Sequence, residues 1–183
     1  MDPVVESRWH AIRDTPLGPA EAVIAFEDKL IAETGWTRRR AGRAVAEYRR
    51  YLLLATLDSK GVSPSPDVDR VWHLHLLYTR DYWDHWCPNV LGFDLHHSPA
   101  TGTNENRAGL EDAYARTLAA YRTAFGQDPP PDLWPAKPLA AKSLIIDPAR
   151  VVVLPRLVWR AAVVAVALLV AGLAVAAYFA VGG

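Results

Sequence analysis

Histidine is concentrated in one part of this sequence. Five of its six histidines lie in the stretch VDRVWHLHLLYTRDYWDHWCPNVLGFDLHHSP, which spans residues 68–99. Imidazole titrates near neutral pH and is the commonest metal ligand among side chains. Carboxylates are interspersed among these histidines, so the stretch has the residue types needed for a metal site or for acid–base chemistry.

Spacing decides which of these side chains can act together. Asp69 and His73 are four residues apart, so on a helix they are neighbours. His75 lies roughly 200° around the helix from His73, so we do not expect it to share a centre with that residue. His96 and His97 follow in a loop. Adjacent residues of an extended segment point in opposite directions, so we expect only one of them to face inward.

One interpretation is a metal site formed by Asp69, His73 and one or both of His96 and His97. Zinc suits a mixed set of imidazole and carboxylate ligands, with water completing the shell. Further oxygen ligands are available nearby in the sequence, at Asp94 and Glu105. This interpretation predicts a pocket beside His73 in which the imidazoles converge on one ion.

The other interpretation is structural. Asp69 and His73 would form a hydrogen-bonded pair in which the carboxylate fixes the imidazole tautomer, and the loop histidines would bond to backbone groups. Tryptophan and tyrosine are frequent in this stretch, so the rings would pack in an aromatic core. His85 lies amid Asp81 and Asp84 and is expected to face solvent. The sequence leaves both interpretations open.

The well-specified catalytic signatures are absent. The patterns HExxH, CxxC, GxSxG, GxGxxG and GxxxxGK[ST] do not occur. Cys87, the single cysteine, is expected near a helix C-terminus, where the dipole disfavours a nucleophilic thiolate. It follows His73 by fourteen residues, about 21 Å along a helix, which disfavours a shared metal centre. Whether the protein is an enzyme stays open.

Helical periodicity dominates the chain up to about residue 126 and predicts an all-α domain of about four main helices. We expect helices over about 22–34, 38–58, 66 to between 87 and 92, and 104–125. Thr37 and Ser65 are suitable N-caps, and Pro66 suits the first helical position. Gly35 and Gly126 are typical C-terminal stops.

The composition divides the chain into four parts. Residues 1–17 are assigned to an N-terminal lead-in, 18–136 to the helical domain, 137–156 to a linker and 157–181 to a transmembrane helix. Within the helical domain, the proline-rich run DPPPDLWPAKP is expected to form an extended strap. Trp134 is the residue that would pin this strap to the helices.

The transmembrane prediction rests on residues 161–181, which carry no charge and would span about 31 Å as a helix. The hydrocarbon core of a bilayer is about 30 Å thick. Lysine and arginine precede this segment and only Gly182 and Gly183 follow it, so the positive-inside tendency predicts a tail-anchored protein with its N-terminal domain in the cytoplasm. The N-terminus shows no secretory signal pattern, and the single cysteine excludes an internal disulfide.

The second predicted helix carries a basic side with Arg38, Arg39, Arg40 and Arg43. A solvated face is the favoured interpretation, and a patch that contacts anionic lipid headgroups is the alternative. Nucleic acid is the least favoured partner, because the 20 basic residues are balanced by 20 acidic ones and no binding motif is present.

Several motifs carry a family resemblance. The runs VDRVWHLHLLYTRDYW, LGFDLHHSP and PPPDLWP, within about Phe26 to Pro135, resemble the glycine-rich-domain-protein-like family. The resemblance implies a helical domain and gives no reaction. Besides the candidate metal ligands, it implies signature positions at Trp72, His75, Cys87, Pro99 and Trp134. The glycine-rich tail of the plant members is missing here, and the apolar segment stands in its place.

Two functions follow from these patterns. The first is a membrane-anchored binding or scaffolding module with a protein partner, in which the Asp/His cluster is mainly structural. The second is a metal-dependent hydrolase of the zinc type, with the ion held by Asp69, His73 and His96 or His97.

Overall fold

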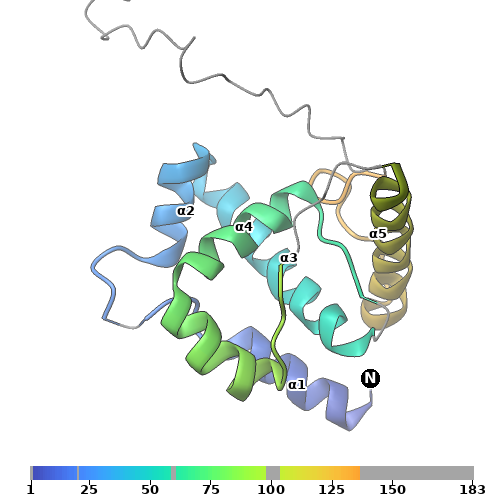
Figure 1. The fold of residues 1–183 in the computed structure, drawn as a ribbon. Coiled ribbons are helices and arrows are strands. Elements are labelled where there is room, and N and C mark those ends of the chain that lie inside the picture. The colour runs from blue at the N-terminus through green and yellow to red at the C-terminus, as the bar shows by residue number, and fades with distance from the viewer. Residues whose placement is uncertain (1, 20, 59–60, 98–103, 137–183) are drawn as a thin grey trace, which may run out of the picture. The chain divides into compact units, whose positions relative to one another are not determined.

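Helix α3, Arg38–Leu57, is the element around which the others pack (Figure 1). In the computed structural model it contacts α1 (Pro3–Asp14), α2 (Phe26–Thr34), α4 (Pro66–Leu77), η1 (Asp81–Leu91) and α5 (Asn104–Phe125). The structure describes residues 2–19, 21–58, 61–97 and 104–136, without the side chains of 104–107. Within these ranges every regular element is a helix, which confirms the all-α prediction.

Local sequence explains where the helices begin and end. The Thr37 and Ser65 hydroxyls accept hydrogen bonds from the backbone N–H groups of residues 40 and 68, and Pro66 occupies the first turn of α4. Gly35 ends α2 in the left-handed conformation, at φ +70°. These caps satisfy backbone groups that a helix end leaves unpaired. The second of the four expected helices begins and ends within a residue of the prediction.

The first predicted helix is shorter than expected. It begins at Phe26 instead of residue 22, and Val23 is fully exposed. The N-terminal segment assigned to a lead-in contains a further helix, α1, which contacts α3 and η1. Arg49 of α3 donates to the carbonyl oxygens of Ile12 and Thr15, so a charged side chain caps the C-terminal end of α1.

The third predicted helix is divided in two, and the expectation of one continuous helix is wrong. α4 ends at Leu77, and the chain turns at Tyr78 before the wider π-helix η1 begins at Asp81. η1 contains Pro88, which has no N–H to donate and whose ring clashes with the carbonyl four residues earlier in a regular helix. The wider turn closes from the Gly92 N–H to the Cys87 carbonyl oxygen, at 2.8 Å.

Trp134 pins the proline-rich strap to the core as expected, but the strap is not extended. Residues 131–133 form a turn in which the Trp134 backbone N–H donates to the Pro130 carbonyl oxygen at 2.8 Å. The Trp134 indole is buried and donates to Glu47 Oε2 of α3 at 2.9 Å. Arg43 forms two hydrogen bonds with Asp132, at 2.6 and 2.7 Å. The Tyr114 hydroxyl of α5 donates to the Pro135 carbonyl oxygen at 2.8 Å. The strap therefore joins α3 to α5.

Within the ranges that the structure covers, no helix is both long and apolar enough to cross a bilayer. The predicted linker at 137–156 and the predicted transmembrane helix at 157–181 lie outside the described residues.

Candidate metal centre

Asp69 and His73 face each other on the first turns of α4. The His73 Nδ1 atom lies 3.3 Å from Asp69 Oδ2, as the four-residue spacing requires. The His73 side chain is 55% exposed and that of Asp69 31%, so both are accessible to an ion from solvent. The pair stands at the surface of α4, away from the centre of the core.

His97 completes the group from the segment that follows η1. Its Nε2 atom lies 2.8 Å from Asp69 Oδ1, and its ring centroid lies 4.4 Å from that of His73 and 4.5 Å from that of Trp72. His97 is only 17% exposed, so the ring is held between its neighbours. Each oxygen of the Asp69 carboxylate therefore faces a different imidazole.

A buried hydrogen-bond chain positions the segment that carries His97. The Trp72 indole N–H donates to the Tyr82 hydroxyl at 2.9 Å, and that hydroxyl donates to the Leu95 carbonyl oxygen at 2.6 Å. Burial raises the pKa of Tyr82, so the hydroxyl keeps the proton that it donates. The chain thus fixes the backbone two residues before His97.

The donor atoms of Asp69, His73 and His97 all lie within 4.8 Å of one another, and they form a group suitable for a metal ion. Ligand atoms about 2.1 Å from a shared zinc ion are at most about 4.2 Å apart. The exposed His73 side chain would have to rotate to close that difference. Metal binding also requires each imidazole to present a lone pair, so the ring proton must move to the other nitrogen.

His96 does not belong to this group. Its side chain is exposed, and its ring lies against Trp83, with the centroids 5.1 Å apart. Of the two adjacent loop histidines, only His97 reaches Asp69. The candidate oxygen ligand Asp94 is exposed and lies outside the group, whereas Pro99 and the side chain of Glu105 fall outside the described part of the chain.

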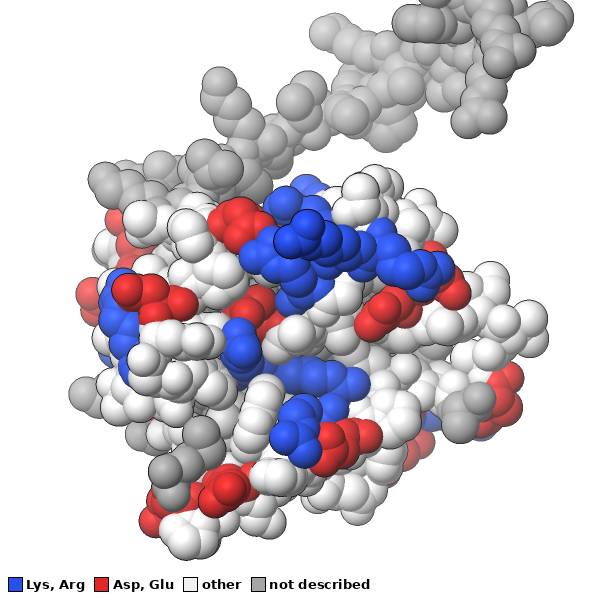
Figure 2. Space-filling view, turned by 180° about the vertical axis from the view of Figure 1, so that it is seen from behind, with Lys and Arg blue, Asp and Glu red and all other residues white. Residues whose placement is uncertain are grey.

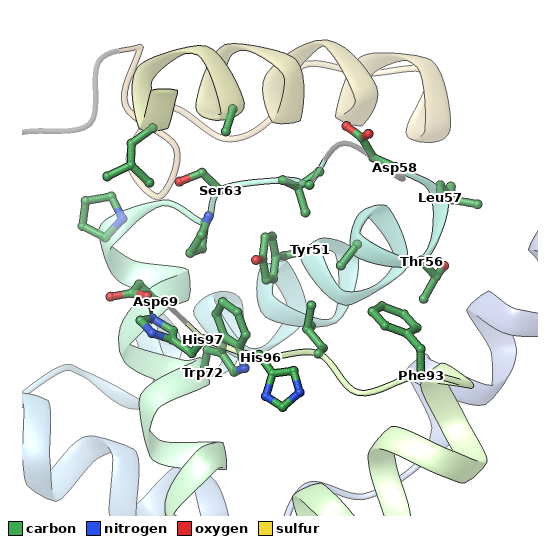
Figure 3. Close-up of a pocket in the computed structure, with 18 residues that line it drawn as sticks. Tyr51, Thr56, Leu57, Asp58, Ser63, Asp69, Trp72, Phe93, His96 and His97 are labelled. Carbon is green, nitrogen blue, oxygen red and sulfur yellow. Dashed lines mark hydrogen bonds and ion pairs between the residues drawn. The ribbon is translucent and has the colours of Figure 1, made fainter. Parts of the chain in front are cut away.

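A cavity of about 950 Å³ opens beside Asp69 and His97 (Figure 3). α3, α4, α5, the connection before α4 and the segment 93–97 all contribute to its walls. Much of the lining is apolar, including Tyr51, Trp72 and Leu95. A volume of this size is in the range of small-molecule sites. The sequence predicted a pocket beside His73, whereas the cavity is lined by Asp69 and His97 and not by His73. Its apolar walls were not predicted, because they come from five separate segments.

His75 occupies a different environment although it is only two residues from His73. It is fully buried, and its Nδ1 atom lies 2.9 Å from the Tyr48 hydroxyl. Its Nε2 atom lies 3.3 Å from Asp81 Oδ2. Because a carboxylate only accepts, Nε2 carries the proton and Nδ1 accepts from Tyr48. Burial lowers the pKa of His75, although Asp81 partly offsets that effect.

Asp81 joins this buried site to the surface. Burial acts to raise the pKa of Asp81, but hydrogen bonds from His75, His85 and the Gly18 backbone N–H lower it overall. The His85 Nδ1 atom lies 3.2 Å from Asp81 Oδ1, and the His85 side chain is half exposed. The break after α4 creates this contact, since Asp81 would point away from His75 in a continuous helix.

Cys87 is buried inside η1, and burial raises the pKa of its thiol. The thiol therefore stays protonated near neutral pH and lacks the thiolate character that a nucleophile or a metal ligand needs. Cys87 is not among the residues of the candidate metal group.

The arginines of α3 lie among acidic partners, and Figure 2 shows one face of the molecule on which basic and acidic side chains are interspersed. Arg38 pairs with Asp28 at 2.6 Å, Arg40 pairs with Asp67, and Arg43 pairs with Asp132. Of the four arginines singled out in the sequence, Arg39 alone has no ion pair among the described residues. Contact of this face with lipid headgroups stays a prediction.

The sequence model of a protein family described as UCP032817-like matches residues 25–121. The chain belongs to the UCP032817-like family. The matched region holds α2 to η1, most of α5 and the whole Asp69–His73–His97 group. No curated protein and no solved structure matches the chain.

The family match corrects the resemblance drawn from the sequence. The motifs containing WHLH and HHSP belong to the UCP032817-like region, and the assignment to glycine-rich-domain-protein-like proteins is wrong. Roles associated with that other family are therefore not transferred to this chain.

Proposed function

We propose that this domain binds a divalent metal ion of the zinc type through Asp69, His73 and His97, and that the bound ion captures a ligand from the adjacent cavity. One observation carries the proposal: the donor atoms of three side chains from two segments lie within 4.8 Å of one another, and two of these residues, Asp69 and His97, line a cavity. The protein would thus act as a metal-centred binding module.

The ligand set favours zinc over calcium or magnesium. Two imidazoles and one carboxylate suit zinc and related transition metals, whereas calcium and magnesium prefer oxygen ligands. Three protein ligands leave a fourth position for water or for a ligand atom, as in catalytic zinc sites. The contact between His97 and Trp72 restricts one ligand ring before the ion binds, which reduces the entropic cost of assembling the site.

The deciding experiment measures metal content in the full chain. The protein is purified with a tag free of histidine, incubated with zinc, dialysed and analysed for bound metal. We expect one ion per chain in the wild type and its loss in Asp69→Asn, His73→Ala and His97→Ala.

His96→Ala is the matched control, because it removes a neighbouring histidine that lines the same cavity but lies outside the group. It should retain the ion. Sub-stoichiometric metal in the wild type would refute the proposal, and so would equal loss of metal in His96→Ala.

Hydrolysis is the second candidate function, and the cavity beside the group supports it. A zinc-bound water has a pKa near 7 and can attack an ester or amide held in such a cavity. Zinc-loaded protein should then hydrolyse a p-nitrophenyl ester faster than Asp69→Asn does. If the wild type with one zinc ion per chain hydrolyses the ester no faster than Asp69→Asn, hydrolysis is refuted and the binding function stands alone.

We further propose that residues 157–181 anchor the domain to a membrane, with the domain on the cytoplasmic side. The support is the uncharged composition of residues 161–181 and the basic residues that precede them. The full chain should resist alkaline carbonate extraction from membranes, and a chain ending at residue 156 should be released. Release of both would overturn this part of the proposal.

A further inference from the structure

The two ends of the cavity differ in chemistry. Asp69 and His97 lie at one end in Figure 3, whereas Leu57 and Phe93 lie towards the other. Leu110 of α5 also contributes to the lining. A ligand that fills the whole cavity therefore meets a polar centre with one part and apolar side chains with the other.

Three large apolar side chains of the cavity are exposed. Seven large hydrophobic residues are exposed among those described, and three of them, Leu57, Phe93 and Leu110, line this cavity, with 45%, 39% and 37% exposure. Covering apolar surface is favourable by about 25 cal/mol for each Å² removed from water. An exposed apolar group gathered at a cavity is typical of a ligand-binding surface.

A metal ion would make the polar end attractive to an anion. A divalent ion held by one carboxylate and two imidazole nitrogens keeps a net positive charge and offers an open coordination position.

We propose that the cavity binds an amphiphile with an anionic head, such as a straight-chain carboxylate. The head would bind the metal ion, and the apolar tail would lie against Leu57, Phe93 and Leu110. This inference rests on the proposed metal function and adds the class of ligand. Tight binding of the ligand would need both the metal ion, which holds the head, and the apolar cavity walls, which hold the tail.

Octanoate is the probe, with acetate as a head without a tail and octan-1-ol as a tail without an anionic head. The full chain is placed in phosphatidylcholine nanodiscs, and empty nanodiscs correct for partition into lipid. Metal content is measured first, so failure of the metal site is recognised separately. We expect octanoate to bind to zinc-loaded protein more tightly than acetate or octan-1-ol, and to lose binding when zinc is removed.

Cobalt substitution tests the orientation of the ligand. Paramagnetic Co²⁺ in place of zinc should broaden the carboxylate carbon signal of octanoate more than its terminal methyl signal. Equal broadening of both ends, or equal binding of octanoate with and without metal, would overturn the proposal while leaving the metal site intact.

Variants at the exposed end test the tail. Leu57→Asp and Leu110→Asp should each weaken octanoate binding about tenfold or more, because the tail loses apolar contact and meets a charge. Both should retain one metal ion per chain. Leu77→Asp is the matched control, since Leu77 is 66% exposed and does not line the cavity. Unchanged octanoate binding in both cavity variants would contradict the proposal.

Discussion

His73 and His75 are two residues apart on α4 and each contacts an aspartate, but they have opposite surroundings. His75 is enclosed by the rings of Phe26, Tyr48, Tyr82 and Trp86, with both nitrogens in polar contacts. His73 is more than half exposed and shares Asp69 with His97 beside a cavity. The residue types are the same, so the difference between the two sites comes from burial and from what remains accessible.

The two sites differ in whether their histidines can give up present contacts to bind a metal ion. Both nitrogens of His75 are engaged in the core, so a metal ion would have to break buried hydrogen bonds, each costing about 1–3 kcal/mol to leave unmade. His73 and Asp69 can rotate at the surface. We therefore assign a structural role to the buried site and ligand binding to the open one.

The largest expected effect is on folding, in His75→Ala. Removing the ring leaves a gap among aromatic side chains, leaves the Tyr48 hydroxyl without its acceptor and removes one of the donors to Asp81, which should lower the free energy of unfolding by roughly 3 kcal/mol. Urea denaturation measures this change. His73→Ala is the control and should change stability by less than about 0.5 kcal/mol, because its side chain is half exposed. Equal effects would remove the distinction between the two sites.

Zinc should stabilise the protein through the open site alone. At a free zinc concentration 100-fold above the Kd, the free energy of unfolding should rise by about 2.7 kcal/mol. Thermal denaturation with zinc and with a chelator measures the shift. His85→Ala should show the same shift as the wild type, and Asp69→Asn should show none. A full shift in Asp69→Asn would place the ion elsewhere.

The pH dependence of stability should report on the buried site. The pKa of His75 in the folded protein lies below its ordinary value of 6.5. As the pH falls, His75 is therefore protonated in the unfolded chain at a higher pH than in the folded protein. The free energy of unfolding thus decreases as the pH falls below about 6.5.

The wild type should show this decrease more strongly than His75→Gln, whose side chain does not titrate. Denaturation between pH 8 and pH 5 tests the difference, which should be smaller than the effect of deleting the ring. Parallel curves for the two proteins would show that His75 does not titrate as the structure implies.

The smallest effect is expected at the surface end of the buried network. His85 is half exposed, so its contact with Asp81 is screened by solvent. His85→Ala should lower the free energy of unfolding by less than about 0.5 kcal/mol. If His85→Ala lowers the free energy of unfolding as much as His75→Ala does, His85 is part of the structural site and not a screened surface contact.

Local features of the sequence determined much of this molecule. Thr37, Ser65 and Pro66 specify helix starts through bonds made within one turn, and Gly35 specifies an end through its own backbone. The i, i+4 spacing that places His73 beside Asp69 is likewise a property of a single helix. Such contacts involve few residues along the chain, so sequence patterns report them directly.

Tertiary structure decided the rest. His97 reaches Asp69 across 28 residues because Trp72 and Tyr82 fix the segment before it, and no local pattern specifies that contact. The division after Leu77 turns Asp81 towards His75, and thereby separates a structural histidine from a candidate ligand two residues away. The sequence showed that Asp and His were available, whereas only packing decided which of them stay accessible to an ion.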